Sequence, residues 1–294
     1  MKVCVLGSGG LLGHMLIRVL SDSHDVYGTT REMASNSSPL VRFLSPDKWI
    51  GGVDAANLRS IENIFELNQF DVVINCIGLI KQRSDQLDDR LMMSVNGEFP
   101  HLLAGIANQN GVKVIHISTD CVFSGIKGNY IETDTPDPVD VYGRSKLFGE
   151  LTDDTNLTIR TSHIGRELSV KKSLVEWLLS QRNGQVSGFS GAIYSGLTTK
   201  SLARIVRSLI SDHPSLSGLF HVASQPISKY DLLCILNSKL KLKLSITPDD
   251  VLISDRSLDG TRFLLTTGLE VPSWDQMLDE FVSDEMTYEQ LGFR

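Results

Sequence analysis

The segment DVYGRSKLFGE, residues 140–150, places Tyr142 and Lys146 four residues apart. On a helix this spacing puts both side chains on one face. A phenol with a pKa of about 10 is a poor acid at neutral pH, but a nearby cation favours its ionised form. The pair could therefore move a proton in a reaction. Alternatively, Tyr142 packs in a core and Lys146 is solvated.

A hydroxyl group at the end of an apolar run could complete this chemistry. The run VKVIHIS predicts a buried strand that leads to Thr119, 23 residues before Tyr142. Thr119 could hydrogen-bond a carbonyl oxygen while Tyr142 gives that oxygen a proton and hydride reaches the carbon. Thr119, Tyr142 and Lys146 are thus the candidate catalytic residues.

A glycine-rich turn near the N-terminus, GSGGLLG, gives the second chemical signal. Gly7, Gly10 and Gly13 stand between a strand pattern and a helix pattern, as in dinucleotide-binding turns. They would permit a tight turn, close approach of a pyrophosphate, and close helix packing, while the helix N-terminus supplies free N–H groups. We expect cofactor contacts here, including Leu11 and Leu12. The alternative is a glycine-rich turn with no ligand.

The end of the second predicted strand indicates which dinucleotide is bound. NAD sites usually have an acid there, whereas VYGTTRE has Thr30 and Arg31 before Glu32. An arginine suits a 2′-phosphate, so the sequence favours NADP, with NAD as the alternative cofactor and a solvated Arg31 as the alternative reading. Asp54 is a candidate for the adenine amino group, although Asp also caps helices.

The elements that must position these residues follow an alternating pattern. Apolar runs at 2–7, 24–30, 70–78 and 112–118 predict buried strands, and helix patterns cover 12–20, 58–68 and 91–108. Buried strands that alternate with helices indicate an α/β fold with a Rossmann-type doubly wound parallel sheet. We expect an NADP-binding domain over 1–162. Residues 163–294 should mainly form a smaller mixed α/β substrate-binding domain, with some elements allowed to return to the first.

Residues 118–150 combine three motifs: S-T-D-x-V-F-x-G, a Tyr-x-E-x-D stretch with prolines, and V-Y-G-x-S-K-x-x-G-E. With the glycine turn, they resemble the extended branch of the short-chain dehydrogenase/reductase superfamily, and most of all the dTDP-4-dehydrorhamnose reductase family. The resemblance runs over essentially the whole chain. It implies NADPH-dependent reduction of a 4-keto-6-deoxyhexose linked to dTDP or UDP, for a surface polysaccharide. It also gives Lys146 a second role at the nicotinamide ribose.

The resemblance also implies further contacts on both sides of the site. Cys76 and Gly78 would line the cofactor at the end of the third predicted strand. The expected substrate-binding residues are Cys121, Val122, Phe123, His163 and Arg256. Other cations that could meet a substrate diphosphate, or simply be solvated, are Arg166, Lys171, Lys172 and Arg262.

Cys121 departs from the family pattern, which commonly has a tyrosine there. A cysteine at this position resembles the fucose-synthase relatives, which epimerise the sugar before they reduce it. Epimerisation needs a second acid or base, and His163 and Glu167 are the candidates for that role. Related dehydratases have a glutamate at this position, so elimination is disfavoured. Two other functions stay open: an epimerase/reductase of the same fold, and a non-catalytic nucleotide-binding regulatory subunit.

Composition limits the partners of the 294-residue chain. Its net charge is −7 and it has no Lys/Arg block, which argues against nucleic acid. The four cysteines are scattered without a CxxC pair, which argues against a metal site or a disulfide framework. No apolar run is long enough for a bilayer and no leader pattern is present. We therefore expect a cytoplasmic protein without a membrane partner, and consider a homodimer.

Overall fold

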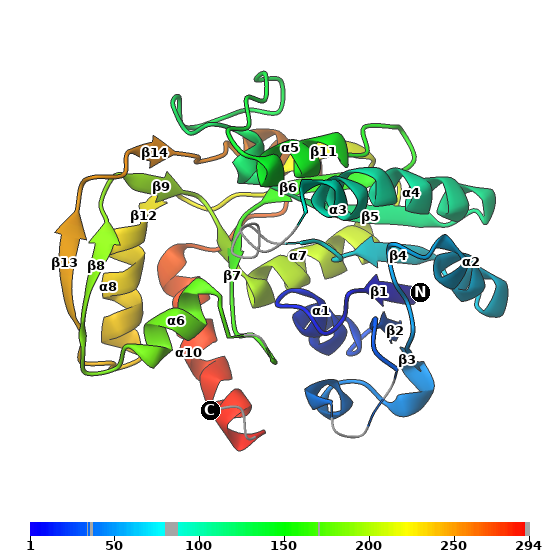
Figure 1. The fold of residues 1–294 in the computed structure, drawn as a ribbon, viewed down its shortest axis with the longest axis horizontal. Helices are drawn as coiled ribbons and strands as arrows, with labels where there is room; N and C mark the ends of the chain where they lie inside the picture. Colours follow the sequence, from blue (N-terminus) through cyan, green and yellow to red (C-terminus); the bar gives the residue numbers. More distant parts are fainter. Residues whose placement is uncertain (34, 36–37, 80–87, 170, 292–294) are drawn as a thin grey trace.

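A seven-stranded sheet lies at the centre of the larger part of the molecule (Figure 1). The computed structural model describes residues 1–33, 35, 38–79, 88–169 and 171–291. Across the sheet the order is β3 (Trp49–Ile50), β2 (Asp25–Thr29), β1 (Lys2–Leu6), β4 (Val72–Asn75), β5 (Lys113–Thr119), β6 (Leu157–Thr161) and β11 (Gly218–His221). Every adjacent pair is parallel. The strand order reverses between β1 and β4, which is where doubly wound sheets bind nucleotides. The predicted fold class is confirmed.

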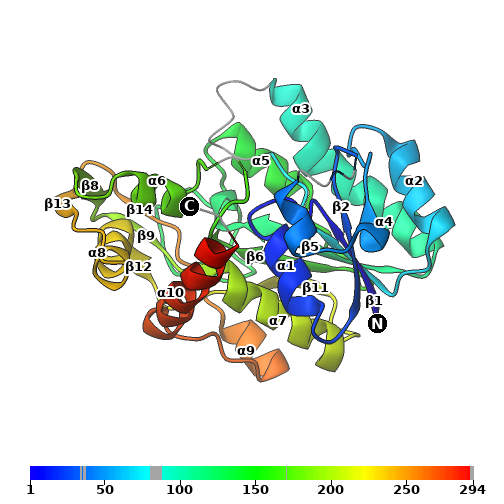
Figure 2. The ribbon, with the colours of Figure 1, turned by 90° about the horizontal axis from the view of Figure 1, so that it is seen from below.

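Helices cover both faces of this sheet (Figure 2). They are α1 (Gly13–Leu20), α2 (Leu58–Leu67), α3 (Asp89–Met93), α4 (Phe99–Gln109), α5 (Val141–Phe148) and α7 (Thr199–Asp212). Side chains of β1 alternate between two cores, as a strand requires. Val3 and Val5 belong to the core that contains α1 and α7, whereas Cys4 and Leu6 belong to the core under α2 and α4.

The predicted helix over 91–108 is interrupted at its centre. A π-helical turn, Ser94–Glu98, joins α3 to α4, and Pro100 stands in the first turn of α4. The helix continues through this turn, since Phe99 N donates to Ser94 O, and proline, which has no N–H, leaves the next position without a donor. Single π-helical turns are frequent at functional sites, and this one carries Asn96.

The rest of the second half of the chain forms small sheets and four further helices. The strands are β7 (His163–Ile164), β8 (Gln185–Phe189), β9 (Ala192–Tyr194), β10 (Leu197–Thr198), β12 (Ile227–Ser228), β13 (Ser245–Asp249) and β14 (Ser254–Asp255). The helices are α6 (Leu174–Ser180), α8 (Lys229–Lys239), α9 (Thr261–Thr267) and α10 (Trp274–Gln290). Short 3₁₀ turns occur at Pro39–Arg42, Pro46–Lys48 and Asp120–Val122. Although α7 and β11 come from this half, they complete the large sheet and its cover. A domain boundary at 162/163 stays a prediction.

None of the helices within the described ranges is long and apolar enough to cross a membrane.

Candidate active site

The glycine turn after β1 lies so close to neighbouring main chain that it leaves no room for side chains. Gly7 has a φ of +75°, and a Cβ there would lie 3.2 Å from the Cys76 main chain. A Cβ at Gly13 would lie 2.3 Å from the Gly7 oxygen. Helix α1 begins at Gly13, so its first N–H groups face the turn. The turn thus brings main chain, with no side chain between, to the carboxyl end of β1.

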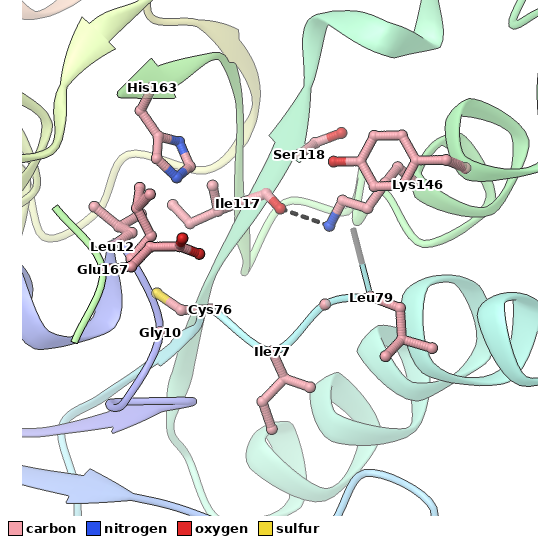
Figure 3. Close-up of a pocket in the computed structure, with 13 residues that line it drawn as sticks. Gly10, Leu12, Cys76, Ile77, Leu79, Ile117, Ser118, Lys146, His163 and Glu167 are labelled. Carbon is pink, nitrogen blue, oxygen red and sulfur yellow. Dashed lines mark hydrogen bonds between the residues drawn. The ribbon is translucent and has the colours of Figure 1, made fainter. Parts of the chain in front are cut away.

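Two adjoining cavities open at the carboxyl ends of the central strands. The smaller, of about 290 Å³, lies over β1, β4 and β5 (Figure 3). The larger, of about 490 Å³, extends over β7, β9 and β14. Residues that line both are Leu11, Ser118, Tyr142, His163 and Glu167. The smaller cavity thus lies where a dinucleotide is expected, and the larger adjoins it on the side of the second half.

Most predicted cofactor contacts line the smaller cavity. They are Gly10, Leu11, Leu12, Cys76, Gly78, Tyr142 and Lys146. Burial raises the pKa of the Cys76 thiol to about 12, so this wall is uncharged. The fit to a dinucleotide is good, because the turn has no Cβ in the way and α1 presents its N-terminus.

The residues expected at the adenosine end lie outside this cavity. Arg31 is exposed and has no hydrogen-bond or ion-pair partner among the described residues. The Thr30 hydroxyl accepts from Trp49 Nε1 at 2.6 Å and donates to the Glu32 oxygen. Asp54 accepts from Ala56 N at 2.9 Å in a local turn, and it is not the helix cap considered as its alternative, because Asn57 is the N-cap of α2. Arg31 is therefore the group best able to meet an added anion.

Asn96 fastens the Cys76–Leu79 segment to α5. Its Oδ1 accepts from Leu79 N at 2.8 Å, and its Nδ2 donates to Leu79 O and to Ser145 Oγ. Ser145 Oγ in turn donates to Tyr142 O at 2.8 Å. The helix predicted over 91–108 includes Asn96 but gives it no role in the site. Its role follows from the π-helical turn, which the hydrophobic pattern does not reveal.

Helix α5 places Tyr142 and Lys146 on the same cavity. Asp140 caps the helix by accepting from Gly143 N at 2.8 Å. A Cβ at Gly143 would lie 2.3 Å from the Cys121 oxygen, so α5 sits directly on the loop after β5. Lys146 Nζ donates to Ile117 O at 2.7 Å (Figure 3). Burial lowers the pKa of Lys146 to about 8, against opposing effects of Glu150 and Cys76.

Tyr142 is neutral in this structure. Burial raises the pKa of its phenol, Cys121 adds to the rise, and a hydrogen bond with Thr119 opposes it. We expected Lys146 to lower the pKa of the phenol; burial raises it instead, so that expectation is wrong. A protonated phenol is nevertheless the form that a proton donor needs.

Thr119 lies beside Tyr142 in the larger cavity and has a competing partner. Its hydroxyl donates to Asp120 Oδ1 at 3.1 Å and accepts from Cys121 N at 3.2 Å. Burial raises the pKa of Asp120. To donate to a substrate oxygen, the Thr119 hydroxyl has to turn away from this carboxyl.

A buried polar network supports the strand ends from below, and sequence reasoning missed it. His116 contacts Asn75 Nδ2 at 3.2 Å and Lys146 Nζ at 3.3 Å. Glu150 accepts from Ser118 Oγ at 2.6 Å and pairs with Arg160 through two hydrogen bonds of 2.7 Å. Polar residues within the apolar strand run, such as the histidine in VIHIS, were the available signal.

Three of the five expected substrate residues line the larger cavity. They are Cys121, His163 and Arg256. Burial raises the pKa of the Cys121 thiol to about 12 and lowers that of His163 to about 4, so both are neutral. Arg256 Nη1 lies 3.8 Å from Cys121 Sγ, and its Nε donates to Phe123 O at 2.9 Å. Further lining residues that the sequence did not single out include Ser173, Tyr194, Lys229 and Ser254.

The other two expected substrate-binding residues do not face the cavity that was predicted to contain them. Val122 and Phe123 are fully buried and line neither cavity. Phe123 stacks on Tyr130 with ring centres 4.0 Å apart, inside a small separate core. Their side chains therefore hold the loop after β5 instead of meeting a ligand.

Two of the candidate diphosphate cations are also engaged elsewhere. Arg166 is buried in ion pairs with Glu176 and Glu285. Arg262 donates to Leu219 O and lies over the Phe220 ring. Neither lines either cavity, and among the described residues Lys229 and Arg256 are the lysine and arginine that line the larger one.

A parallel Rossmann sheet with this threonine, tyrosine and lysine at its nucleotide crevice is the arrangement of the short-chain dehydrogenase/reductase class. Residues 1–286 match the family model described as RmlD substrate binding domain, and the chain belongs to this family. A spore coat polysaccharide biosynthesis protein, SpsK of Bacillus subtilis, is 31% identical over 78% of this chain and 75% of the relative.

Further similarities agree with this family. A dTDP-4-dehydrorhamnose reductase of Aggregatibacter actinomycetemcomitans is 28% identical over 78% of this chain and 76% of that protein. A crystal structure of dTDP-4-dehydrorhamnose reductase from Bacillus anthracis in complex with NADP has a TM-score of 0.80 at 22% identity, and covers 96% of this chain and 99% of that one. At that identity the structural match shows the fold.

Proposed function

We propose that the protein is an NADPH-dependent reductase of the 4-keto group of a nucleoside-diphosphate-linked 6-deoxyhexose. The observation that carries the proposal is the position of Tyr142, which lines both the cavity under the glycine turn and the larger cavity beside it. A proton donor for a ketone has to stand between cofactor and substrate. The reductase names of the relatives support the same substrate class.

The cofactor supplies the hydride, and this chain's side chains handle the proton. Tyr142, neutral through burial, donates its proton to the keto oxygen. Thr119 hydrogen-bonds that oxygen once its hydroxyl leaves Asp120. Lys146, fixed by Ile117 O, stands where the resemblance places the nicotinamide ribose. Arg256 and Lys229 line the larger cavity together with Asp120 and Glu167, and their cationic groups suit a diphosphate.

The epimerising alternative has little support at Cys121. A thiol with its pKa raised to about 12 is protonated and cannot act as a base near neutrality. A regulatory subunit without activity would not need a proton donor at the junction of two cavities. We place the reaction in the cytoplasm, in the synthesis of a sugar for a surface polysaccharide. The experiment below distinguishes a dTDP-linked from a UDP-linked substrate.

An activity screen tests the proposal. Purified protein and NADPH are offered dTDP- and UDP-linked 4-keto-6-deoxy sugars, and loss of the reduced-cofactor absorbance is followed. We expect oxidation of NADPH with at least one of these sugars, and none with the matching 4-hydroxy sugar. If the folded protein binds NADPH but no 4-keto nucleotide sugar causes oxidation, the proposal is wrong.

A further inference from the structure

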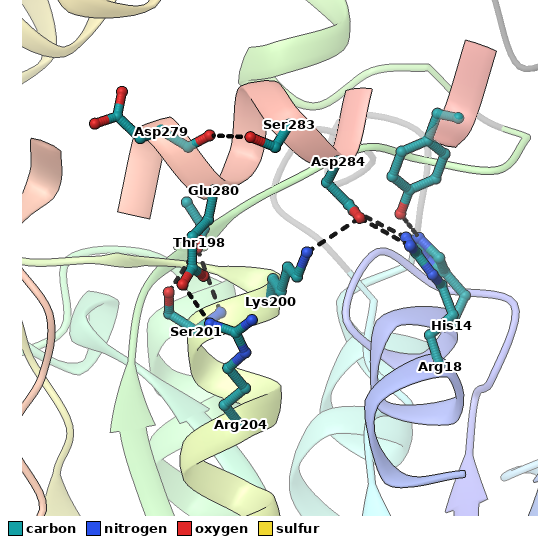
Figure 4. Close-up of polar contacts among 11 residues, drawn as sticks. His14, Arg18, Thr198, Lys200, Ser201, Arg204, Asp279, Glu280, Ser283 and Asp284 are labelled. Atoms are coloured by element: carbon teal, nitrogen blue, oxygen red, sulfur yellow. Dashed lines mark hydrogen bonds and ion pairs between the residues drawn. The ribbon is translucent and has the colours of Figure 1, made fainter. Parts of the chain in front are cut away.

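The later turns of α10 lie near α1, the helix that follows the glycine turn (Figure 4). Asp284 on α10 receives two hydrogen bonds from Arg18 of α1, at 2.8 and 2.9 Å, and an ion pair from Lys200 of α7 at 3.3 Å. The Asp284 side chain is only 6% exposed. This buried pairing fixes the position of α10 relative to the start of the cofactor-binding helix.

One turn further along α10, Tyr288 contacts His14 of α1. The hydroxyl lies 2.5 Å from His14 Nε2, and both side chains are buried. His14 Nδ1 lies 2.8 Å from the carbonyl oxygen of Gly10, in the glycine turn. The guanidinium groups of Arg18 and Arg166 lie 5.1 and 5.5 Å from the Tyr288 ring, which holds the phenol in place.

The directions of these hydrogen bonds follow from the chemistry of the groups. A carbonyl oxygen only accepts, so His14 Nδ1 carries a proton. Burial lowers the pKa of His14 to about 4, so the ring is neutral and Nε2 has a lone pair. Nε2 therefore accepts the proton of Tyr288. The chain of donors runs from Tyr288 through His14 to Gly10.

Fixing the Gly10 carbonyl also fixes a donor for the cofactor. A peptide unit is planar and trans, so the Leu11 N–H points opposite to the Gly10 C=O. His14 donates to this carbonyl twice, from Nδ1 and from its main-chain N at 3.2 Å, and so draws it towards α1. Within the described residues the Leu11 N–H has no acceptor, and Leu11 lines the cofactor cavity. Glycine at position 10 makes rotation of this peptide easy unless something holds it.

We propose that Tyr288 is a positioning residue for cofactor binding. Through His14 it orients the Gly10–Leu11 peptide, so that the Leu11 N–H faces the pyrophosphate. The inference rests on the proposed use of NADPH, but it concerns binding and can fail separately. It predicts a defect limited to ligands that contain a pyrophosphate, because Tyr288 lines neither cavity and is not among the residues expected at the adenosine end.

The experiment compares three ligands by titration calorimetry: NADPH, 2′-phospho-ADP-ribose, and adenosine 2′-monophosphate, which lacks the pyrophosphate. Tyr288→Phe should raise the Kd of the first two by about five- to tenfold, the effect of one buried hydrogen bond, and leave the third unchanged. At saturating NADPH, kcat and the KM of the sugar should equal those of wild type. Tyr230→Phe, which removes a hydroxyl from α8 away from both cavities, is the matched control and should change nothing.

Two further variants keep the test decisive if Tyr288→Phe is unstable. His14→Asn keeps a donor near the place of Nδ1 and should bind NADPH more tightly than His14→Leu, which has none. Unchanged affinity for NADPH in folded Tyr288→Phe overturns the proposal. So does an equal loss for adenosine 2′-monophosphate, which would indicate a purely structural role. If wild type binds none of the three ligands, the proposed cofactor and this inference both fail.

Discussion

The cofactor side and the substrate side of the active site differ in how far main chain and side chains contribute to their walls. On the cofactor side, the Gly7–Gly13 turn and the Cys76–Leu79 segment braced by Asn96 bring main chain to the cavity, beside the side chains of α5. On the substrate side, side chains from several distant segments form the walls. Main-chain recognition depends on local spacing, whereas side-chain recognition depends on how distant segments pack. At the glycine turn, changes that disturb the backbone should therefore be the most harmful, whereas in the larger cavity changes of side chain should be.

The largest effect is expected at Tyr142, where the two sides meet. Tyr142→Phe keeps the ring and removes the donated proton, so turnover should fall by roughly 10² to 10⁴. NADPH affinity should stay near that of wild type, because the ring and α5 are retained. Steady-state kinetics and a cofactor titration check both. Near-normal turnover in the folded variant would remove the proton-donor assignment.

The second largest effect is expected from a backbone change on the cofactor side. In Gly13→Ala the new methyl would lie 2.3 Å from the Gly7 oxygen, which is main chain and cannot move aside cheaply. We expect NADPH binding to be lost and the melting temperature to fall. Gly105→Ala is the matched control, because no atom lies within 4 Å of its Cβ. On exposed α4 it should stabilise the protein by up to about 1 kcal/mol. Equal behaviour of the two variants would contradict the close packing of the turn.

The free energy of unfolding should depend on pH through Lys146, because its charged form is buried. The folded protein gives up this proton at about pH 8, whereas the unfolded chain keeps it to about pH 10.5. The unfolded state thus binds more protons in that window, and stability conferred by neutral Lys146 rises with pH. From about pH 7.5 to 9.5, wild type should gain about 2 kcal/mol in free energy of unfolding relative to Lys146→Met. Urea denaturation at both pH values measures this, and parallel pH dependence in the two proteins would count against it.

Arg31 is the side chain for which we expect a difference between NADPH and NADH. Arg31→Ala should weaken NADPH by about tenfold through loss of a charged hydrogen bond to the 2′-phosphate. NADH, which has no such phosphate, should bind as before. Titration of both cofactors distinguishes this from a general loss, since an equal drop for the two would exclude the 2′-phosphate role.

The smallest effect is expected at Cys121. Its thiol is held neutral by burial, so Cys121→Ser should keep reduction of a correctly configured sugar. In heavy water, wild type should place no deuterium on the carbons beside the ketone. Deuterium uptake that Cys121→Ser abolishes would establish the epimerising alternative.

The same contrast explains what the sequence could predict. The glycine turn and the Tyr142–Lys146 pair are local patterns on single elements, and alternation of strands and helices was enough for the sheet. Phe123 belongs to the S-T-D-x-V-F-x-G motif, yet its side chain lies in a core with Tyr130. Arg166 forms an ion pair with Glu285, which lies 119 residues away in the chain. The π-helical turn at Asn96 and the contact between His14 and Tyr288 likewise depend on tertiary packing, which no local pattern records.

Transfer of label from the cofactor tests the central claim most directly. NADPH carrying deuterium at the transferable position of the nicotinamide is incubated with the enzyme and a 4-keto nucleotide sugar, and the product is examined by mass spectrometry and NMR. We predict one deuterium at carbon 4 of the sugar, at a rate that Tyr142→Phe reduces. A reduced product without deuterium at that carbon, or full-rate transfer by the folded Tyr142→Phe variant, would contradict the account.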